Sequence, residues 1–439
     1  MNSSSSGCSG NRSVSAITRR QALQLGAVGG LGLTLPSILR AESEAARTAK
    51  SAKAKSVILL WIQGGVSHHD SFDPKPDAPA EVRGEFGTIA TKLPGVLFAD
   101  QVPLLAGMLD QFALIRSVTH KESAHERGSM YMVEGRRPPR DTGVSHSGNP
   151  MLGSIIAHQL GARAGVPAFV SNPGNDFTTG FTGQGWLSRS TRPFRGVDVG
   201  VLKSGEKAGA DYLEQRKQLL TQLDMSRADS KAHSWDRFQA QAVDLLTSGK
   251  TAAAFDLSKE SDATKKLYGI GLKGDRLGEF TLTARRLVEA GVRFVTIGRD
   301  SWDHHDKIFP QLKGRLPGLD AAFSGLLTDL KQRSMFNDTL VVYLTEYGRT
   351  PKINDKAGRD HWPQAFSVAL AGAGIKPGQV IGASDRIGAE VKDSPVSPEQ
   401  IAATILHLVG IDPQTIVNRI DGRPTTVAEE GDPLKQLLS

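Results

Sequence analysis

The chain has 439 residues, of which 39% are hydrophobic and 23% charged, a composition typical of a soluble globular protein that can bury a large core. The net charge is +7, but no basic stripe alternates with aromatic residues, so nucleic acid is not an expected partner. The only cysteine, Cys8, excludes an internal disulfide, a cysteine-based zinc site and a cysteine nucleophile in the body of the protein.

The N-terminal segment has the pattern of an export signal. Arg19 and Arg20 precede an apolar stretch over residues 22–39 that contains four glycines and a proline, and a polar, Ala-rich stretch follows. Adjacent arginines before a short apolar run are typical of twin-arginine signals, and the glycines make the run a poor transmembrane helix. We therefore predict a signal peptide and linker over residues 1–46, and a periplasmic or extracellular protein without a stable transmembrane segment. A membrane anchor, a buried helix and a fortuitous arginine pair in a cytoplasmic enzyme are the alternatives.

The body of the chain alternates between predicted strands and helices. Continuous apolar runs of strand length predict buried strands, and two longer amphipathic segments predict helices over residues 277–291 and 316–335. The predicted strands are residues 55–65, 112–118, 168–171, 292–298, 339–348 and 366–372. This alternation predicts an α/β fold whose mostly parallel sheet is covered on both faces. Residues of about 205–275 have helical spacing without strand signals, which indicates a helical insertion.

Polar clusters follow the predicted strands. In a parallel sheet the loops at the carboxyl ends of the strands converge, and ligands bind there. The clusters are "GGVSHHDSFDPKP" (64–76), "THKESAHERGSMY" (119–131), "RDSWDHHD" (299–306) and "TEYGRTP" with "GRDHW" (345–351 and 358–362). Seven of the eleven histidines lie in these clusters, which indicates one shared site.

Imidazoles mixed with carboxylates, without thiolates, are typical of sites for zinc, manganese or iron, with calcium or magnesium where carboxylates dominate. The surplus of such groups is consistent with one or two divalent ions, of which zinc is the first expectation and manganese or calcium the alternatives. Each cluster alone could instead be a hydrogen-bonded turn or a salt bridge. In "WDHHD" (302–306), adjacent side chains point in different directions, which leaves two alternative pairs: Asp303 with His305, or Asp300 with His304.

The ordered motifs resemble those of the exported family called domain of unknown function 1501 (DUF1501), whose core resembles the alkaline phosphatase and sulfatase superfamily. The resemblance covers nearly the whole predicted mature chain, residues 47–439, and includes "GGVSHHDSFDPKP", "SAHERGSMYMVEGRRP", "SWDHHD", "LVVYLTEYGRTPKIN" and "GRDHWPQAF". It implies a three-layer α/β/α sandwich of the alkaline phosphatase type and hydrolysis of esters at phosphorus or sulfur.

The resemblance also implies a set of site residues. The metal ligands that it implies are His68, Asp70, Asp303, His305, Glu346 and His361. The chain departs from the superfamily pattern at three places. Gln63-Gly64-Gly65 stands where an acid is usual, Tyr347 replaces a histidine, and His125 occupies the nucleophile position.

These expectations lead to a metal-dependent hydrolase in which activated water attacks a phosphorylated or sulfated small molecule or glycan. His125 would act as a general base or an additional ligand, with Ser123 and Ser129 as nearby hydroxyls. Arg349 or Arg359 would hold a phosphate or sulfate oxygen, unless they are paired internally with Asp360 or Asp355. The alternative is a non-catalytic, metal-containing envelope protein that binds glycans or protein partners.

Overall fold

The computed structural model describes residues 52–139, 147–163, 165–172, 183–196, 249–272, 276–299, 302–419, 421–429 and 431–439. The predicted signal peptide and linker (1–46) lie outside these residues, as does most of the predicted helical insertion. The described end of that insertion contains the short helices α10 (Lys250–Phe255) and α11 (Asp262–Leu267). Among the described helices, none has both the length and the apolar character that a transmembrane helix needs.

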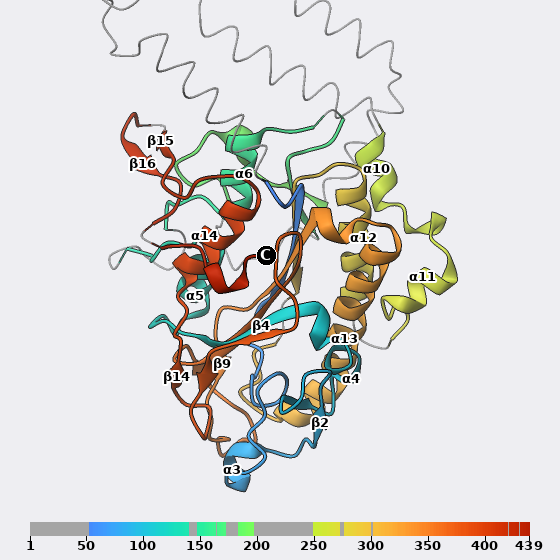
Figure 1. Cartoon of the computed structure of the whole chain (residues 1–439), viewed down its shortest axis with the longest axis vertical. Helices are drawn as coiled ribbons and strands as arrows, with labels where there is room; N and C mark the ends of the chain where they lie inside the picture. The colour runs from blue at the N-terminus through green and yellow to red at the C-terminus, as the bar shows by residue number, and fades with distance from the viewer. Residues whose placement is uncertain are drawn as a thin grey trace, which may run out of the picture. The chain divides into compact units, whose positions relative to one another are not determined.

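A central sheet of eight strands organises the fold (Figure 1). Its spatial order is β12 (Gln379–Ile381), β4 (Phe112–Val118), β11 (Phe366–Gly372), β8 (Thr339–Leu344), β1 (Ser56–Ile62), β7 (Phe294–Arg299), β5 (Phe169–Asn172) and β6 (Phe194–Arg195). All neighbours pair in parallel except β11, which runs antiparallel to both β4 and β8. The predicted α/β fold with a mostly parallel sheet is therefore confirmed.

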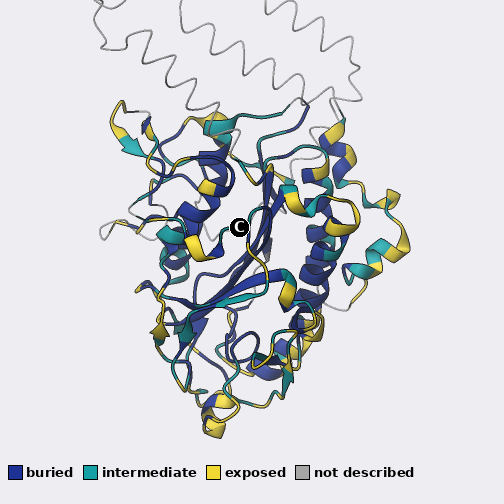
Figure 2. Ribbon diagram, viewed as in Figure 1, coloured by how far each residue is buried: buried dark blue, intermediate teal, exposed yellow. Residues whose placement is uncertain are grey.

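Helices cover both faces of this sheet (Figure 1). The helices α5 (His125–Glu134), α6 (Leu152–Leu160) and α14 (Pro398–Leu408) lie on one face, and α4 (Pro103–Ala106), α12 (Leu277–Glu289) and α13 (Ile308–Gln332) lie on the other. Strand β1 shows why the strands are apolar throughout. Val57, Leu59 and Trp61 belong to the first core, whereas Ile58, Leu60 and Ile62 belong to the second. Figure 2 shows the sheet as an almost continuously buried layer.

Helix α13 begins eight residues before its predicted start at residue 316. Ile308, Phe309 and Leu312 are buried at helical spacing and extend its core-facing side toward the N-terminus. Pro317 lies inside the helix, where a proline removes one backbone hydrogen bond. A proline is a local signal for a helix start, and here the apolar spacing before it outweighs that signal.

Strand β8 ends at Leu344, four residues before the predicted end at residue 348. The chain leaves the sheet because Glu346 turns toward the loop after β1, where its Oε1 accepts a hydrogen bond of 2.7 Å from the backbone N–H of Gly64. The carboxyl ends of β1, β4, β7 and β8 and the start of the antiparallel β11 all lie at this edge of the sheet. The polar loops of the sequence therefore meet there.

Candidate metal centre

Four loops at the carboxyl edge of the sheet supply the side chains of the candidate site. His125 is the first residue of α5, which follows β4, and Asp303 and His305 lie between β7 and α13. Glu346 follows β8, and His361 lies in β10 (His361–Trp362) just before β11. The site therefore depends on contacts between segments that are far apart in the sequence.

Three imidazoles surround the carboxylate of Asp303. The Nε2 atom of His125 lies 3.0 Å from Oδ2 of Asp303, and those of His305 and His361 lie 2.9 and 3.1 Å from Oδ1. The Nε2 atoms of His305 and His361 are 3.0 Å apart. We call His125, Asp303, His305 and His361 the histidine-aspartate cluster.

The other ring nitrogen of each histidine has an oxygen partner. Nδ1 of His125 lies 2.6 Å from Oε1 of Glu346, and Nδ1 of His305 lies 2.6 Å from Oδ1 of Asp360. Nδ1 of His361 lies 2.7 Å from the backbone carbonyl of Ser123. Carboxylate and carbonyl oxygens only accept hydrogen bonds, so each Nδ1 carries the proton and donates it. Each Nε2 is therefore the nitrogen that is directed at the Asp303 carboxylate.

The pKa values show strong coupling within this cluster. Burial would lower the pKa of His125, but its hydrogen bonds to Asp303 and Glu346 outweigh burial and raise that pKa to about 9. Burial would raise the pKa of Asp303, but hydrogen bonds from His125 and His361, together with the guanidinium of Arg349, hold it well below its usual range. At neutral pH the His125 ring is therefore protonated, and this proton lies between His125 and the ionised carboxylate of Asp303.

A divalent ion can replace that proton. Ligand atoms of His125, Asp303 and His361 lie within 4.8 Å of one another, so one ion can reach all three. Two imidazoles and a carboxylate are a donor set used for zinc and for other first-row divalent metals. The side chains of Asp303 and His305 are 36% and 43% exposed, so the cluster is open to solvent on one side.

Glu346 lies behind His125 rather than in the cluster. Its carboxylate is fully buried, accepts the N–H of Gly64 and holds Nδ1 of His125. Nε2 of His120 donates to the backbone carbonyl of Glu346 over 2.7 Å, while Nδ1 of His120 accepts the N–H of Glu122. Sequence reasoning assigned no role to His120, although it belongs to the same polar loop as His125.

Tyr347, which the sequence analysis noted in place of a histidine, packs directly against the cluster. Its ring is fully buried and stacks on that of His361, with centroids 4.6 Å apart. Its hydroxyl lies 2.7 Å from Nδ1 of His125. Tyr347 therefore fixes the positions of two of the three imidazoles.

The structure does not bring His68 and Asp70 into the cluster. Nε2 of His68 lies 2.9 Å from the carbonyl of Gly388, and burial lowers the pKa of His68 to about 4. Asp70 accepts a hydrogen bond of 2.8 Å from Nε of Arg359, and both side chains are fully buried. These residues form a separate buried polar network.

The two predicted substrate-binding arginines are buried and bonded within the protein. Arg359 directs its five N–H groups at Asp70 and at the carbonyls of residues 82, 350 and 351. Arg349 bonds to Asp303 and to the carbonyls of residues 64, 65 and 359. The internal pairing that the sequence left open is present, although the partners are Asp70 and Asp303 rather than Asp355 or Asp360.

The remaining predicted residues that the structure describes lie outside the cluster. The side chain of Ser129 is buried within α5, and Ser123 contributes only its backbone carbonyl, to His361. His304 is buried against Trp302, with ring centroids 6.3 Å apart, and Asp300 lies outside the described residues. Of the two alternative pairs in "WDHHD", the structure brings Asp303 and His305 together.

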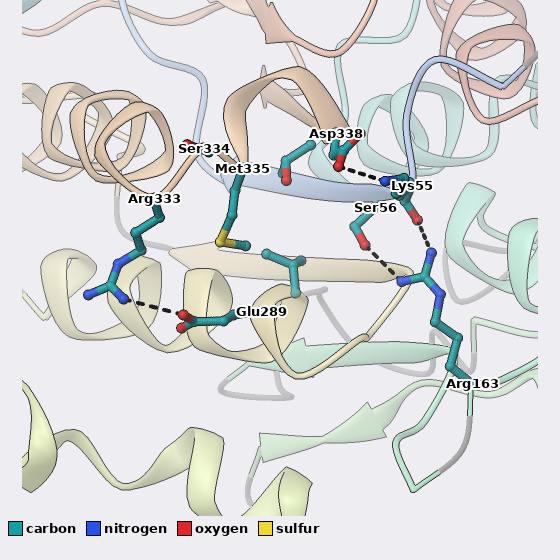
Figure 3. A pocket seen from close by; sticks show the side chains of 10 residues that line it. Lys55, Ser56, Arg163, Glu289, Arg333, Ser334, Met335 and Asp338 are labelled. Carbon is teal, nitrogen blue, oxygen red and sulfur yellow. Dashed lines mark hydrogen bonds and ion pairs between the residues drawn. The ribbon is translucent and has the colours of Figure 1, made fainter.

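A hollow of about 290 Å³ lies at the amino-terminal edge of the sheet, opposite the edge that carries the cluster (Figure 3). Its charged side chains are paired: Lys55 lies 2.8 Å from Asp338, and Arg333 lies 3.3 Å from Glu289. Arg163 donates to the carbonyl of Lys55. None of its lining residues is a histidine, so this hollow offers no imidazole ligand for a metal.

The chain belongs to a family of proteins of unknown function, DUF1501, which its sequence matches over residues 54–438. No curated protein matches the sequence significantly.

Solved structures with a similar fold include a protein of the alkaline phosphatase superfamily from Vibrio parahaemolyticus, with 11% identity, coverage of 91% of this chain and 79% of that one, and a TM-score of 0.40. Alkaline phosphatase from the Antarctic bacterium TAB5 has 14% identity, coverage of 82% and 99%, and a TM-score of 0.38. A phosphonate monoester hydrolase from Silicibacter pomeroyi has 12% identity, coverage of 88% and 76%, and a TM-score of 0.37.

Proposed function

We propose that this protein is an exported, metal-dependent hydrolase that acts on phosphate or sulfate esters. The observation that carries the proposal is the arrangement of the three imidazoles, each of which donates through Nδ1 and directs Nε2 at Asp303. Three separate loops maintain this arrangement at the edge of the sheet where ligands bind in α/β proteins. A salt bridge for stability would not need three rings in one orientation.

A divalent ion bound here would supply Lewis acidity, which polarises an ester oxygen and makes water more acidic. The chain supplies the rest. Asp303 and His361 offer the carboxylate and an imidazole, and Glu346 orients His125 from behind. Such partners fix a ring and raise its basicity. Phosphate and sulfate esters carry negative oxygens, which an ion on the open side of the cluster would attract.

The contacts of His125 indicate whether it acts as a metal ligand or as the general base that activates the nucleophile. A ligand atom of His125 lies within reach of the same ion as those of Asp303 and His361, and its Nδ1 lies 2.6 Å from Glu346, so we assign His125 as a ligand, the second of the two roles that the sequence left open. With both ring nitrogens engaged, none remains to act as a general base. Water is the proposed nucleophile, and no protein hydroxyl is required.

The test combines metal analysis with turnover. Purified full-length protein should bind at least about one divalent ion, and it should hydrolyse some member of a panel of aryl phosphates, phosphodiesters and aryl sulfates. Asp303→Asn should abolish both properties. Asp306→Asn is the matched control, because Asp306 is an exposed acid of the same loop and accepts a hydrogen bond from Gln311. Turnover that survives Asp303→Asn would reject the site.

A non-catalytic role is the second candidate, and one observation favours it. The donors of Arg349 and Arg359 are directed at protein oxygens, so neither guanidinium is aimed at a substrate. In that case the protein would be a metal-containing envelope protein that binds glycans or protein partners. Stoichiometric metal without turnover on the whole ester panel, together with binding of a sulfated or phosphorylated glycan, would support this candidate over hydrolysis.

A further inference from the structure

We propose that the hollow at the amino-terminal edge of the sheet binds a small organic acid, whose carboxylate or phosphate group contacts Arg163 and whose short apolar body packs against Val288 and Met335 (Figure 3). Its volume of about 290 Å³ is close to the lower limit of the range for small-molecule sites. The proposal is independent of ester hydrolysis, because no residue of the histidine-aspartate cluster lines this hollow.

Two helix ends and the starts of two strands form the hollow. Val288 and Glu289 lie in the last turn of α12, and residues 333–335 follow α13. Ser56 and Thr339 are the first residues of β1 and β8, and both are buried. Apolar, hydroxyl and charged side chains thus meet in one space, which is the mixture that binds and orients a small ligand.

The charges of the hollow are not balanced. Three cationic and two acidic side chains line it: Lys55, Arg163, Arg333, Glu289 and Asp338. Asp338 is paired with Lys55 over 2.8 Å, and Glu289 is shared by Arg333 and the buried Arg285. Among the described residues, Arg163 is therefore the lining cation that makes no ion pair.

In the part of the chain that the structure describes, the guanidinium of Arg163 bonds only to neutral oxygens. Its Nη2 donates to the Lys55 carbonyl over 2.8 Å. Its Nη1 donates to the Gly291 carbonyl over 3.0 Å and to Oγ of Ser56 over 3.4 Å. An arginine has five N–H groups, so within this part of the chain two of them, on Nε and Nη2, remain for a ligand. Arginine N–H groups match the geometry of carboxylate and phosphate oxygens.

A second guanidinium near Arg163 also bonds to a neutral oxygen. Nε of Arg293 donates to the Gly161 carbonyl over 2.8 Å. Burial lowers the pKa of both arginines, and the positive charge of Arg163 lowers the pKa of Arg293 further. An anion bound to Arg163 would offset this repulsion, so the local charges favour a negatively charged ligand.

Ser334 places a hydroxyl at a backbone position that favours glycine. Its φ is +58°, and the N–H groups of Ser334 and Met335 bond to the carbonyls of Lys331 and Leu330 over 3.0 and 2.8 Å. This pattern is the Schellman motif, in which the left-handed residue after the helix is usually glycine. Serine is strained there, whereas glycine is not. A contact between this hydroxyl and a bound acid gives a reason for a serine in the lining.

Val288 and Met335 supply apolar surface next to these donors. Figure 3 shows the Met335 side chain extending into the space between Arg333 on one side and Ser56 with Arg163 on the other. Methionine is unbranched and flexible, so it adapts to the shape of a ligand. A short alkyl chain would bury this surface, whereas a bare phosphate ion would leave it in contact with water. We therefore expect an acid with an alkyl body rather than an inorganic anion.

Calorimetric titration of the full-length chain tests the proposal, with a chelator present so that no metal at the cluster binds the probe. The probes are acetate, butyrate, inorganic phosphate and monobutyl phosphate. Butyrate should bind about tenfold more tightly than acetate, because it buries two additional methylene groups, and monobutyl phosphate should exceed phosphate in the same way. The tighter of the two butyl compounds identifies the head group.

Three variants test the assigned contacts. Arg163→Gln should weaken binding of the tighter probe at least about tenfold, because a charged donor is lost. Ser334→Gly should weaken it about threefold or more and should raise the melting temperature, because glycine relieves the backbone strain. Ser394→Gly is the matched control. Ser394 has a φ of +48° in the loop after β14 (Val391–Asp393), so this change should raise the melting temperature without a change in affinity.

The outcomes separate this proposal from ester hydrolysis. Binding that survives Asp303→Asn and falls in Arg163→Gln supports the hollow as the site, even where no ester is hydrolysed. Binding that is lost in Asp303→Asn and kept in Arg163→Gln places the acid at the histidine-aspartate cluster and overturns the proposal. No binding of any probe to the wild type overturns it as well. Equal affinities for the short and the long acids would overturn the assignment of an organic acid.

Discussion

Oε1 of Glu346 lies 2.6 Å from Nδ1 of His125, and this contact joins the loop after β8 to the first turn of α5. The same oxygen accepts the backbone N–H of Gly64 from the loop after β1. One buried carboxylate thus connects three strand ends and fixes which nitrogen of His125 is directed at Asp303. In the proposed metal centre, Glu346 would orient a ligand rather than bind the ion itself.

Glu346→Gln should test whether Glu346 orients His125, because glutamine has nearly the same size as glutamate and leaves no cavity. Glutamine can still accept the N–H of Gly64, but its neutral amide holds the His125 N–H less strongly. Loss of such an outer partner typically weakens metal binding about 10- to 100-fold, so we expect that decrease with little change in thermal stability. Calorimetric titration with Mn²⁺ would measure it. Glu399→Gln is the control, because Glu399 is bonded to Tyr131, outside the cluster. Equal affinities in both variants would contradict the orienting role.

The sheet could be predicted from the sequence because its signal is local. A strand buried on both faces must be apolar at every position, and the run at residues 56–62 shows this directly. Once the strands are predicted, the polar loops that follow them are expected at the carboxyl edge of the sheet. The direction of β11 could not be predicted, because an antiparallel strand between two parallel partners is equally apolar.

The membership of the cluster could be predicted only in part. "HHD" at residues 68–70 and "DHHD" at residues 303–306 look equivalent in the sequence. Asp70 is instead paired with Arg359, which lies 289 positions away, and no local pattern indicates such a partner. His125 likewise belongs to the cluster because of its contacts with Glu346 and Asp303. These residues are far from His125 in the sequence, so no local pattern indicates the contacts.

Gly64→Ala should disrupt the candidate site through backbone geometry. Gly64 has a φ of +122°, and a Cβ there would lie 2.5 Å from the backbone N of Asp303. The loop that carries Asp303 would have to move, so metal binding should be lost and the melting temperature should fall. Gly422→Ala separates the two causes, because Gly422 has a φ of +83° but a Cβ at that position would meet nothing within 4 Å. Metal affinity, measured for both variants, should fall only in Gly64→Ala.

Removal of one partner from the buried pair of Asp70 and Arg359 should strongly destabilise the protein. Arg359→Met leaves the Asp70 carboxylate buried without its partner, which typically costs about 3–5 kcal/mol. The double variant Asp70→Asn with Arg359→Met should recover part of that loss, since no buried charge remains. Denaturant unfolding would measure these free energies. Lys55→Met, which breaks the exposed pair with Asp338, should cost no more than about 1 kcal/mol. A similar loss in both single variants would contradict the argument.

Glu134 should make the stability of the protein depend on pH. Its side chain is buried near the end of α5, and burial raises its pKa from 4.5 to about 8, although hydrogen bonds from Ser147 and Asn149 oppose the shift. The folded protein therefore binds the proton more tightly than the unfolded chain does. The stability from this group is fully present below about pH 4.5 and is lost as the pH rises through about 8.

The test is denaturant unfolding of two variants from pH 5 to about 9, each compared with the wild type. Glu134→Gln mimics the protonated acid, so its stability relative to the wild type should increase from pH 5 to about pH 8 and then level off. Glu81→Gln, a change on the exposed helix α3 (Ala80–Arg83), should keep a constant difference. A constant difference for Glu134→Gln as well would mean that Glu134 is already ionised at pH 5, and that its hydrogen bonds to Ser147 and Asn149 stabilise the charge more than burial opposes it.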